Sequence, residues 1–247
     1  MQLPDYMAAY KASLASYLTT YGREKAMEMV VGGQYEEIGI LESSALLTLG
    51  LQPDHYLVDV GCGSGRLPFV LRGFLKGKYV GTDILGEALD YARERVARED
   101  WDFIQTIEPT IPVPDKKADL VSFFSVFTHL LDEDIYRFLA EAKRVTRPGG
   151  KIVFSYLDYA VPSHWTVFEN TLADTNPNRV LNKFISRPAI ERWAKALSLD
   201  IERLYDGDER WISLTKSFQY SDGRIASGIV EFGQSVGVIR VPLMNAT

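Results

Sequence analysis

The short segment VDVGCGSGR, residues 58–66, has the composition of a ligand-binding turn. Gly61, Gly63 and Gly65 occupy alternate positions after a β-branched run and before a helix-like stretch. Glycines between a strand and a helix N-terminus allow a ligand to touch the backbone directly. Asp83 ends the next strand-like run, at the separation at which nucleoside-binding α/β folds hold a ribose. This spaced acid favours a binding turn over a turn that only links a strand to a helix.

Arg66 separates two classes of nucleoside cofactor. A dinucleotide site has the pattern G-x-G-x-x-G, whose third glycine lets helix and strand pack closely beside the pyrophosphate. Counted from Gly61, that third position is the bulky Arg66, and Asp59 would be poorly placed beside a pyrophosphate. An acid at this position suits a cationic ligand, such as the amino acid end of S-adenosylmethionine, and Arg66 could face the carboxylate of that ligand. The segment therefore predicts S-adenosylmethionine and not NAD.

At these residues the sequence resembles the class I S-adenosylmethionine-dependent methyltransferases. The similarity continues in the order and spacing of that family through IPVPD (111–115), ADLV (118–121), SVFTH (125–129), VTRPGG (145–150) and GQSVGVIR (233–240), the last of which resembles the final strand of the family. GGQY (32–35) and SVFTH bear a weaker likeness to a bacterial subgroup that acts on small metabolites.

The resemblance implies S-adenosylmethionine as methyl donor and S-adenosylhomocysteine as product. It also implies a set of cofactor-binding residues: Asp59, Gly61, Cys62, Gly63, Gly65, Arg66, Asp83, Ile84, Glu108, Ser125 and Val126. One position departs from the family, because the acid that usually recognises adenine aligns near Ile107, with Glu108 beside it. Adenine is then held either by Glu108 or by backbone groups alone.

Composition limits the class of protein. With 247 residues, 46% of them hydrophobic, the chain can bury the core of one α/β domain. A net charge of −6 gives no general attraction to phosphate backbones, so we expect no nucleic-acid partner. Cys62 is the only cysteine, which leaves no internal disulfide or cysteine-based zinc site, and we expect no metal. No apolar run reaches the roughly 18 residues of a membrane span and no secretory signal is visible, so we expect a cytoplasmic protein without a membrane partner.

The order of predicted elements indicates the fold. Apolar and aromatic residues recur at helical spacing in residues 4–21 and again in residues 38–49. Strand-like and helix-like runs then alternate up to residue 156, which is typical of a parallel sheet with helices on both faces and its ligand at the carboxyl ends of the strands. With the family resemblance, this predicts an α/β fold with a Rossmann-like, doubly wound, mostly parallel seven-stranded sheet, an N-terminal helical extension and an insertion after the fifth strand.

We expect one domain over residues 1–247. It would comprise a helical cap (1–50), a cofactor-binding core (54–157) and a substrate side with the C-terminal strands (158–247). The alternation breaks at residues 158–183, which form either an insertion that covers the substrate or a plain connecting loop. A second irregular region, residues 206–230, could reach the same edge of the sheet.

Methyl transfer is an in-line displacement at a sulfonium carbon, so the enzyme mainly aligns the acceptor with the methyl group. A hydroxyl acceptor must also lose a proton, and a base helps. His129 follows the fourth strand at the ligand edge and is our first candidate for this base, although a capping or packing role remains open. His164 and Asp158, beyond the fifth strand, are the alternatives. Aromatic side chains in the cap and near the insertion suggest substrate contacts by Tyr17, Tyr21, Tyr35, Tyr156 and Trp165.

The acceptor is predicted only as a class. The Asn/Asp-Pro-Pro-aromatic motif of methyltransferases that act on planar amine nitrogens is not found after the fourth strand; Asn176-Pro177-Asn178 is in a different place and lacks the second proline. We therefore expect O-methylation of a small, natural-product-like metabolite. Two other functions stay open, namely a reaction on the same fold without methyl transfer and a non-catalytic cofactor-binding subunit that activates a partner. The sequence does not specify the oligomeric state.

Overall fold

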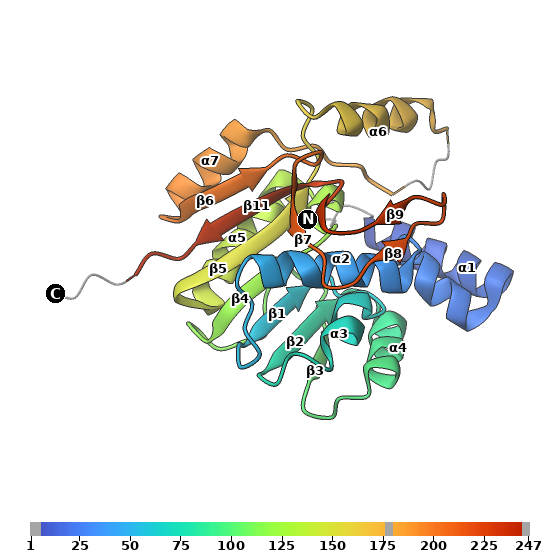
Figure 1. Ribbon diagram of the computed structural model, residues 1–247, viewed down its shortest axis with the longest axis horizontal. Helices are drawn as coiled ribbons and strands as arrows, with labels where there is room; N and C mark the ends of the chain where they lie inside the picture. The colour runs from blue at the N-terminus through green and yellow to red at the C-terminus, as the bar shows by residue number, and fades with distance from the viewer. Residues whose placement is uncertain (1–5, 176–179, 244–247) are drawn as a thin grey trace.

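The fold was analysed in a computed structural model that describes residues 6–175 and 180–243. Its core is one sheet with the strand order β3-β2-β1-β4-β5-β11-β6 (Figure 1). The strands are β1 (Leu57–Val60), β2 (Tyr79–Asp83), β3 (Asp102–Gln105), β4 (Ala118–Phe123), β5 (Thr146–Tyr156), β6 (Asp200–Tyr205) and β11 (Ser235–Arg240). β11 alone runs in the direction opposite to the other six strands of this sheet. The predicted mostly parallel, seven-stranded sheet is confirmed.

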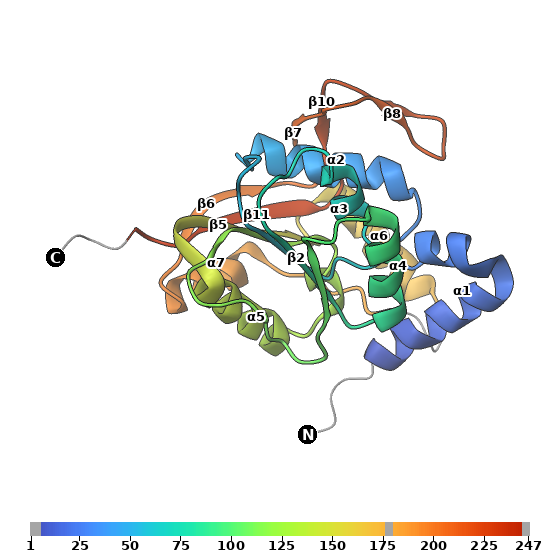
Figure 2. The same ribbon diagram turned by 90° about the horizontal axis from the view of Figure 1, so that it is seen from below.

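Helices cover both faces of the sheet, as the alternating pattern predicts (Figure 2). One face packs against α2 (Tyr35–Thr48), α3 (Arg66–Leu71) and α4 (Gly86–Val96), and the other against α5 (Asp132–Val145) and α7 (Arg187–Ala196). The central strand β1 is buried along its whole length because helices cover both of its sides. Neighbouring residues of this strand, such as Leu57 and Val58, therefore belong to two different hydrophobic clusters.

Some element boundaries differ from those predicted. The first helix, α1 (Tyr6–Met29), continues past the predicted end, with a break at Gly22, where φ is 74°. An acid such as Asp132 before an apolar stripe is a typical N-cap, but here Asp132 is the first helical residue of α5, and Leu131 occupies the cap position. Pro4 and the stretch 176–178 lie outside the described residues. None of the described helices combines the length and the apolar character needed to cross a membrane.

The two irregular regions differ in secondary structure. Residues 158–183 include a helix, α6 (Pro162–Ala173). The second region, residues 206–230, forms two small antiparallel sheets and packs on α2, where the Thr215 backbone nitrogen donates to Ser44 Oγ. These sheets pair β7 (Arg210–Ser213) with β10 (Ile229–Glu231), and β8 (Phe218–Gln219) with β9 (Ile225–Ala226).

Candidate functional site

A cavity of about 640 Å³ lies at the carboxyl ends of the parallel strands. The segments that follow β1, β2, β3 and β4 line it, and α1 and α6 contribute side chains from above the sheet edge. This is the edge at which the sequence predicts the ligand, and the volume suits a small molecule. None of the lining residues comes from 206–230, so the expectation that this region reaches the ligand edge is wrong: it packs on α2 instead.

Most of the residues predicted to bind the cofactor line this cavity. They are Asp59, Gly61, Cys62, Gly63, Arg66, Asp83, Ile84, Glu108, Ser125 and Val126. Gly65 does not line it. Gly65 caps α3 with a φ of 87°, and a Cβ there would lie 2.7 Å from the Cβ of Ala92 on α4. Its place is explained by helix packing, and not by a ligand contact.

The loop after β1 presents backbone to the cavity. Gly61 and Gly63 both have left-handed φ angles, 75° and 55°, which favour glycine. A Cβ on Gly63 would lie 2.5 Å from Cγ1 of Val31, so a larger residue would also collide with the segment after α1. The Gly63 nitrogen donates to Oδ2 of Asp83 over 2.9 Å, and the Leu85 nitrogen donates to Oδ1 over 2.9 Å. The Asp83 carboxylate thereby connects the glycine loop to the segment after β2.

Asp59 is 3% exposed yet lines the cavity. Its Oδ2 accepts a hydrogen bond from the Tyr79 hydroxyl at 3.0 Å, and its Oδ1 accepts one from Ser122 Oγ at 2.9 Å. Burial, and then the nearby carboxylate of Glu42, raise the pKa of Asp59 to about 7. A cation beside Asp59 would favour its charged form.

Cys62 is buried within the loop. Burial raises the pKa of its thiol well above the ordinary value. Because the thiolate is the nucleophilic form, this raised pKa argues against a reactive cysteine. The small side chain fits the turn.

Arg66 has a buried acidic partner that the sequence analysis missed. Its Nε donates to Oε1 and Oε2 of Glu42 at 3.0 and 3.1 Å, its Nη2 also donates to Oε1, and its Nη1 donates to the carbonyl oxygen of Val31. Glu42 lies on α2 and is 2% exposed, and both members of the ion pair line the cavity. The sequence signal that could have revealed this partner is a single charged residue, Glu42, within the otherwise uncharged stretch 38–49.

His129 also lines the cavity and lies in the short 3-10 turn η1 (Phe127–His129). Its Nδ1 is 2.6 Å from the carbonyl oxygen of Leu181. A carbonyl can only accept, so Nδ1 carries the hydrogen and Nε2 of the neutral ring keeps its lone pair. Burial lowers the pKa of His129 below its ordinary value, which favours the neutral form. Tyr10 of α1 packs edge-on against the ring, with centroids 5.7 Å apart.

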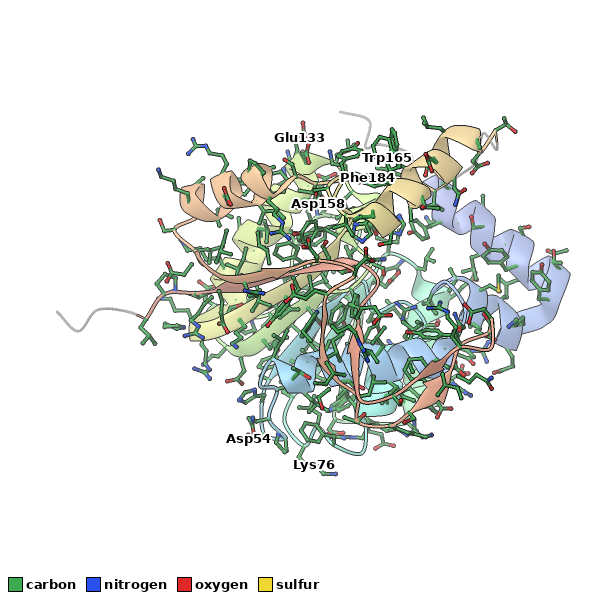
Figure 3. The ribbon with its side chains drawn as sticks, turned by 45° about the horizontal axis from the view of Figure 1, so that its top comes forward. Asp54, Lys76, Glu133, Asp158, Trp165 and Phe184 are labelled. Atoms are coloured by element: carbon green, nitrogen blue, oxygen red, sulfur yellow. The ribbon has the colours of Figure 1, made fainter. Side chains whose placement is uncertain are left out.

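The structure does not bring the two alternative catalytic residues to the cavity. His164 is 0% exposed, and both ring nitrogens are engaged: Nδ1 accepts from the Asp158 backbone nitrogen at 2.9 Å, and Nε2 lies 3.1 Å from the Gly233 carbonyl oxygen. Asp158 is also buried, and its carboxylate lies near Arg187, 3.6 Å from Nε (Figure 3). Neither residue lines the cavity, because these contacts join α6 to the ends of β5 and β11.

Of the residues predicted to contact substrate, only Tyr17 lines the cavity. The Tyr35 hydroxyl donates to the Ser64 carbonyl oxygen and belongs to the core, and Tyr156 is fully buried. Tyr21 is exposed, and so is Trp165, whose indole bonds to Glu169 on α6 (Figure 3). These four side chains lie away from the cavity lining, because an aromatic side chain fits a core or a helix surface as readily as a binding site.

Comparison with known proteins agrees with this geometry. A family described as "Methyltransferase domain" matches residues 58–154, the segment that runs from the glycine loop through β5. Residues 58–154 of the chain carry this methyltransferase domain. Its curated relatives include malonyl-[acyl-carrier protein] O-methyltransferase of Yersinia pestis, 37% identical over 113 residues, or 45% of this chain and 40% of the relative. Fatty-acid O-methyltransferase of Mycolicibacterium smegmatis is 32% identical over 48% of this chain and 42% of the relative.

The chain spans less than half the length of those relatives. Solved structures share its fold over a larger share of the chain. Magnesium protoporphyrin IX methyltransferase of Synechocystis, with bound S-adenosylhomocysteine, has a TM-score of 0.60 at 15% identity and covers 96% of each chain. A S-adenosylmethionine-dependent methyltransferase of Methanosarcina mazei has a TM-score of 0.57 at 16% identity over 80% of this chain and 97% of its own.

The cavity lining also contains residues that sequence motifs did not single out. Tyr10 and Val167 line the cavity from α1 and α6, Phe138 lines it from α5, and Gln234 precedes β11. Periodicity had placed Tyr10 on the apolar face of a helix without showing that this face meets the cavity. Only the packing of α1 over the sheet edge reveals its position.

Proposed function

We propose that this methyltransferase moves the methyl group of S-adenosylmethionine to a hydroxyl oxygen of a small, neutral and largely apolar molecule. The observation that carries the proposal is the orientation of His129. Its Nδ1 is engaged by the Leu181 carbonyl, which leaves the lone pair of Nε2 available as a base, and His129 lines the cavity. A neutral alcohol needs such a base, and general base catalysis typically contributes about 10²- to 10⁴-fold to the rate.

The cofactor would occupy the part of the cavity built by β1 and β2. Backbone exposed by the glycine loop and the carboxylate of Asp83 suit a ribose, because each Asp83 oxygen retains a lone pair after its bond to the backbone. Asp59 suits an ammonium group and Arg66 a carboxylate. Ile107 and Glu108, which also line the cavity, suit the adenine. When bound, S-adenosylmethionine supplies a methyl group activated by the sulfonium charge.

The charges around the cavity favour a neutral acceptor. Among the described residues that line it, the only lysine or arginine is Arg66, which is already paired with Glu42. Carboxylates line it at Glu42, Asp59, Asp83 and Glu108. The remaining surface on the acceptor side is mainly apolar, with Tyr17, Phe138 and Val167 among its residues. Among the described side chains of the lining, no unpaired lysine or arginine could bind an anionic acceptor. An apolar molecule with one hydroxyl group suits this surface better.

A second candidate is esterification of a carboxylic acid. The names of the curated relatives favour it, since they are O-methyltransferases of malonyl-[acyl-carrier protein] and of fatty acids. A carboxylate is already deprotonated near neutral pH, so this reaction needs alignment but no base. The two candidates therefore differ in their requirement for His129.

The test uses S-adenosylmethionine with a deuterated methyl group. The purified protein is incubated with medium-chain alcohols, phenols and the matching carboxylic acids, and labelled products and S-adenosylhomocysteine are followed by mass spectrometry. We expect labelled methyl ethers, a loss of about 10²- to 10⁴-fold in turnover for His129→Ala, and unchanged turnover for the control His55→Ala. His129→Gln should also be slow, since glutamine can orient a hydroxyl but cannot take its proton.

Other outcomes identify the rival functions. If the labelled products are methyl esters and turnover survives His129→Ala, the acceptor is a carboxylic acid and the proposal of a hydroxyl acceptor is overturned. Cofactor consumption without S-adenosylhomocysteine would indicate a reaction other than methyl transfer. Cofactor binding with no turnover except after addition of a second protein would indicate an activating subunit.

A further inference from the structure

Glu42 is an unusual residue for the middle of a buried helix. It lies on α2 among buried residues such as Leu41 and Ala45, and it is 2% exposed. Its carboxylate nevertheless lines the ligand cavity, on the side of the glycine loop. Buried ion pairs contribute little net stability, because desolvation offsets most of their attraction. The pair of Glu42 with Arg66 therefore calls for a role beyond stability.

The close approach of two helices places Glu42 beside Arg66. A Cβ on Gly39 would lie only 2.6 Å from the carbonyl oxygen of Arg66 and 2.9 Å from Cγ2 of Val70, so glycine lets α2 approach α3 at this point. Glu42 follows Gly39 by three residues and so lies on the same face of α2. Arg66 begins α3 directly after the glycine loop. The packing of the two helices thus fixes an acid opposite the first residue after the ligand-binding turn.

The hydrogen bonds of Arg66 leave part of its guanidinium available. The group has five N–H donors. Nε and Nη2 donate to the Glu42 carboxylate and Nη1 donates to the Val31 carbonyl, which occupies one hydrogen on each nitrogen. One N–H on Nη1 and one on Nη2 have no protein acceptor among the described residues. Because Arg66 lines the cavity, these remaining donors could bind a carboxylate there.

We propose that Glu42 is a positioning residue that holds the Arg66 guanidinium toward the carboxylate at the methionine end of the cofactor. Glu42 does not touch the ligand in this arrangement. It fixes the plane of the guanidinium, with the Val31 carbonyl as a second support, so that little side-chain freedom is lost when the carboxylate binds. The proposal concerns cofactor recognition only, and it stands whether the acceptor is an alcohol or a carboxylic acid.

The experiment compares two ligands that differ by one carboxylate. Isothermal titration calorimetry measures the Kd of S-adenosylhomocysteine and of its decarboxylated analogue, which keeps the adenosine, the sulfur and the amino group. Wild type, Glu42→Gln and the control Glu36→Gln are titrated without any acceptor, and thermal unfolding shows that each variant is folded. Glu36 is an exposed acid on the same helix. We expect Glu42→Gln to weaken S-adenosylhomocysteine about tenfold or more, the scale of a misplaced charge-assisted hydrogen bond, with the analogue affected by less than about twofold.

Two results would overturn the proposal. Equal affinities for S-adenosylhomocysteine in wild type and in folded Glu42→Gln would make the ion pair purely structural. Equal weakening of both ligands would mean that the substitution distorts the glycine loop without acting through the carboxylate. If Glu42→Gln does not fold, a double variant that exchanges the two charges, Glu42→Arg with Arg66→Glu, restores an ion pair and is titrated in its place. That variant should discriminate against the carboxylate-bearing ligand, and retained wild-type preference would overturn the proposal as well.

Discussion

The backbone nitrogen of Gly63 lies 2.9 Å from Oδ2 of Asp83, so one side chain at the end of β2 holds the loop that follows β1. The other oxygen, Oδ1, accepts from the Leu85 nitrogen at 2.9 Å. A carboxylate oxygen can accept more than one hydrogen bond, which leaves Asp83 able to bind a ligand while it orders the backbone on both sides. The strand register places the two segments together, because Asp59 pairs with Gly81 and Val60 with Thr82 in parallel β1 and β2.

Replacing Asp83 by alanine should weaken cofactor binding. The variant loses the hydrogen bonds that the ribose hydroxyls donate to a charged carboxylate, which are worth about 1.5–3 kcal/mol, and it also releases the Gly63 backbone. Calorimetry with S-adenosylhomocysteine measures the change, and Asp90→Ala, an exposed acid paired with Arg93, is the control. A Kd within about twofold of wild type in a folded Asp83→Ala protein would assign the ribose contact to another residue.

Cofactor binding should release a proton from Asp59. Burial raises the pKa of Asp59 to about 7 in the free protein, so a large fraction is protonated below that pH. An ammonium group beside the carboxylate favours the charged form and lowers this pKa, and binding near pH 6 must then expel the proton. Affinity should rise by up to about tenfold per pH unit below pH 7 and level off above it. Calorimetry at pH 6 in two buffers of different ionisation enthalpy measures the released proton, and Asp59→Asn should abolish the effect. Identical heats in both buffers for the wild type would contradict the assignment of the ammonium to Asp59.

The sequence predicts the sheet and its cofactor edge because both depend on local signals. Alternating strand-like and helix-like runs determine the layers, and the glycine loop and Asp83 are each recognisable within a few residues. Parallel pairing then brings their ends to one edge of the sheet without further information. The cavity of the structure accordingly contains nearly all residues predicted for the cofactor.

Contacts made by tertiary packing could not be read from the sequence. Glu42 reaches Arg66 only because Gly39 lets two helices approach, and His129 is oriented by the carbonyl of Leu181, far along the chain. Tyr35 was predicted to contact substrate, but its hydroxyl donates to the Ser64 carbonyl oxygen inside the core. An aromatic residue near a binding motif has the same sequence signature in either role.

The rate of methyl transfer should depend on pH through His129. Burial lowers the pKa of this histidine below its ordinary value of 6.5, and only the neutral ring can accept a proton. The turnover number at saturating cofactor and acceptor should therefore be constant near neutral pH and fall as the pH drops through this lowered pKa. His129→Gln should remove the acidic limb and leave a low, flat profile. An acidic limb that persists in folded His129→Gln would assign the titration to another group.

His164 should affect stability and not catalysis. Its ring joins the Asp158 backbone nitrogen to the Gly233 carbonyl oxygen, and a Cβ on Gly207 would collide with its Nε2, so the imidazole fills the space between α6 and the end of β6. His164→Ala leaves a buried donor and a buried acceptor without their partner and opens a cavity, which should lower the free energy of unfolding by about 2–5 kcal/mol. Urea unfolding measures this loss, with the surface variant His55→Ala as the control. At low temperature, where the variant is folded, the Kd of S-adenosylhomocysteine and the turnover number should stay within about threefold of wild type. Loss of a general base would lower turnover by about 10²-fold or more. A stable His164→Ala protein with turnover reduced by that factor would instead make this histidine part of the catalytic machinery.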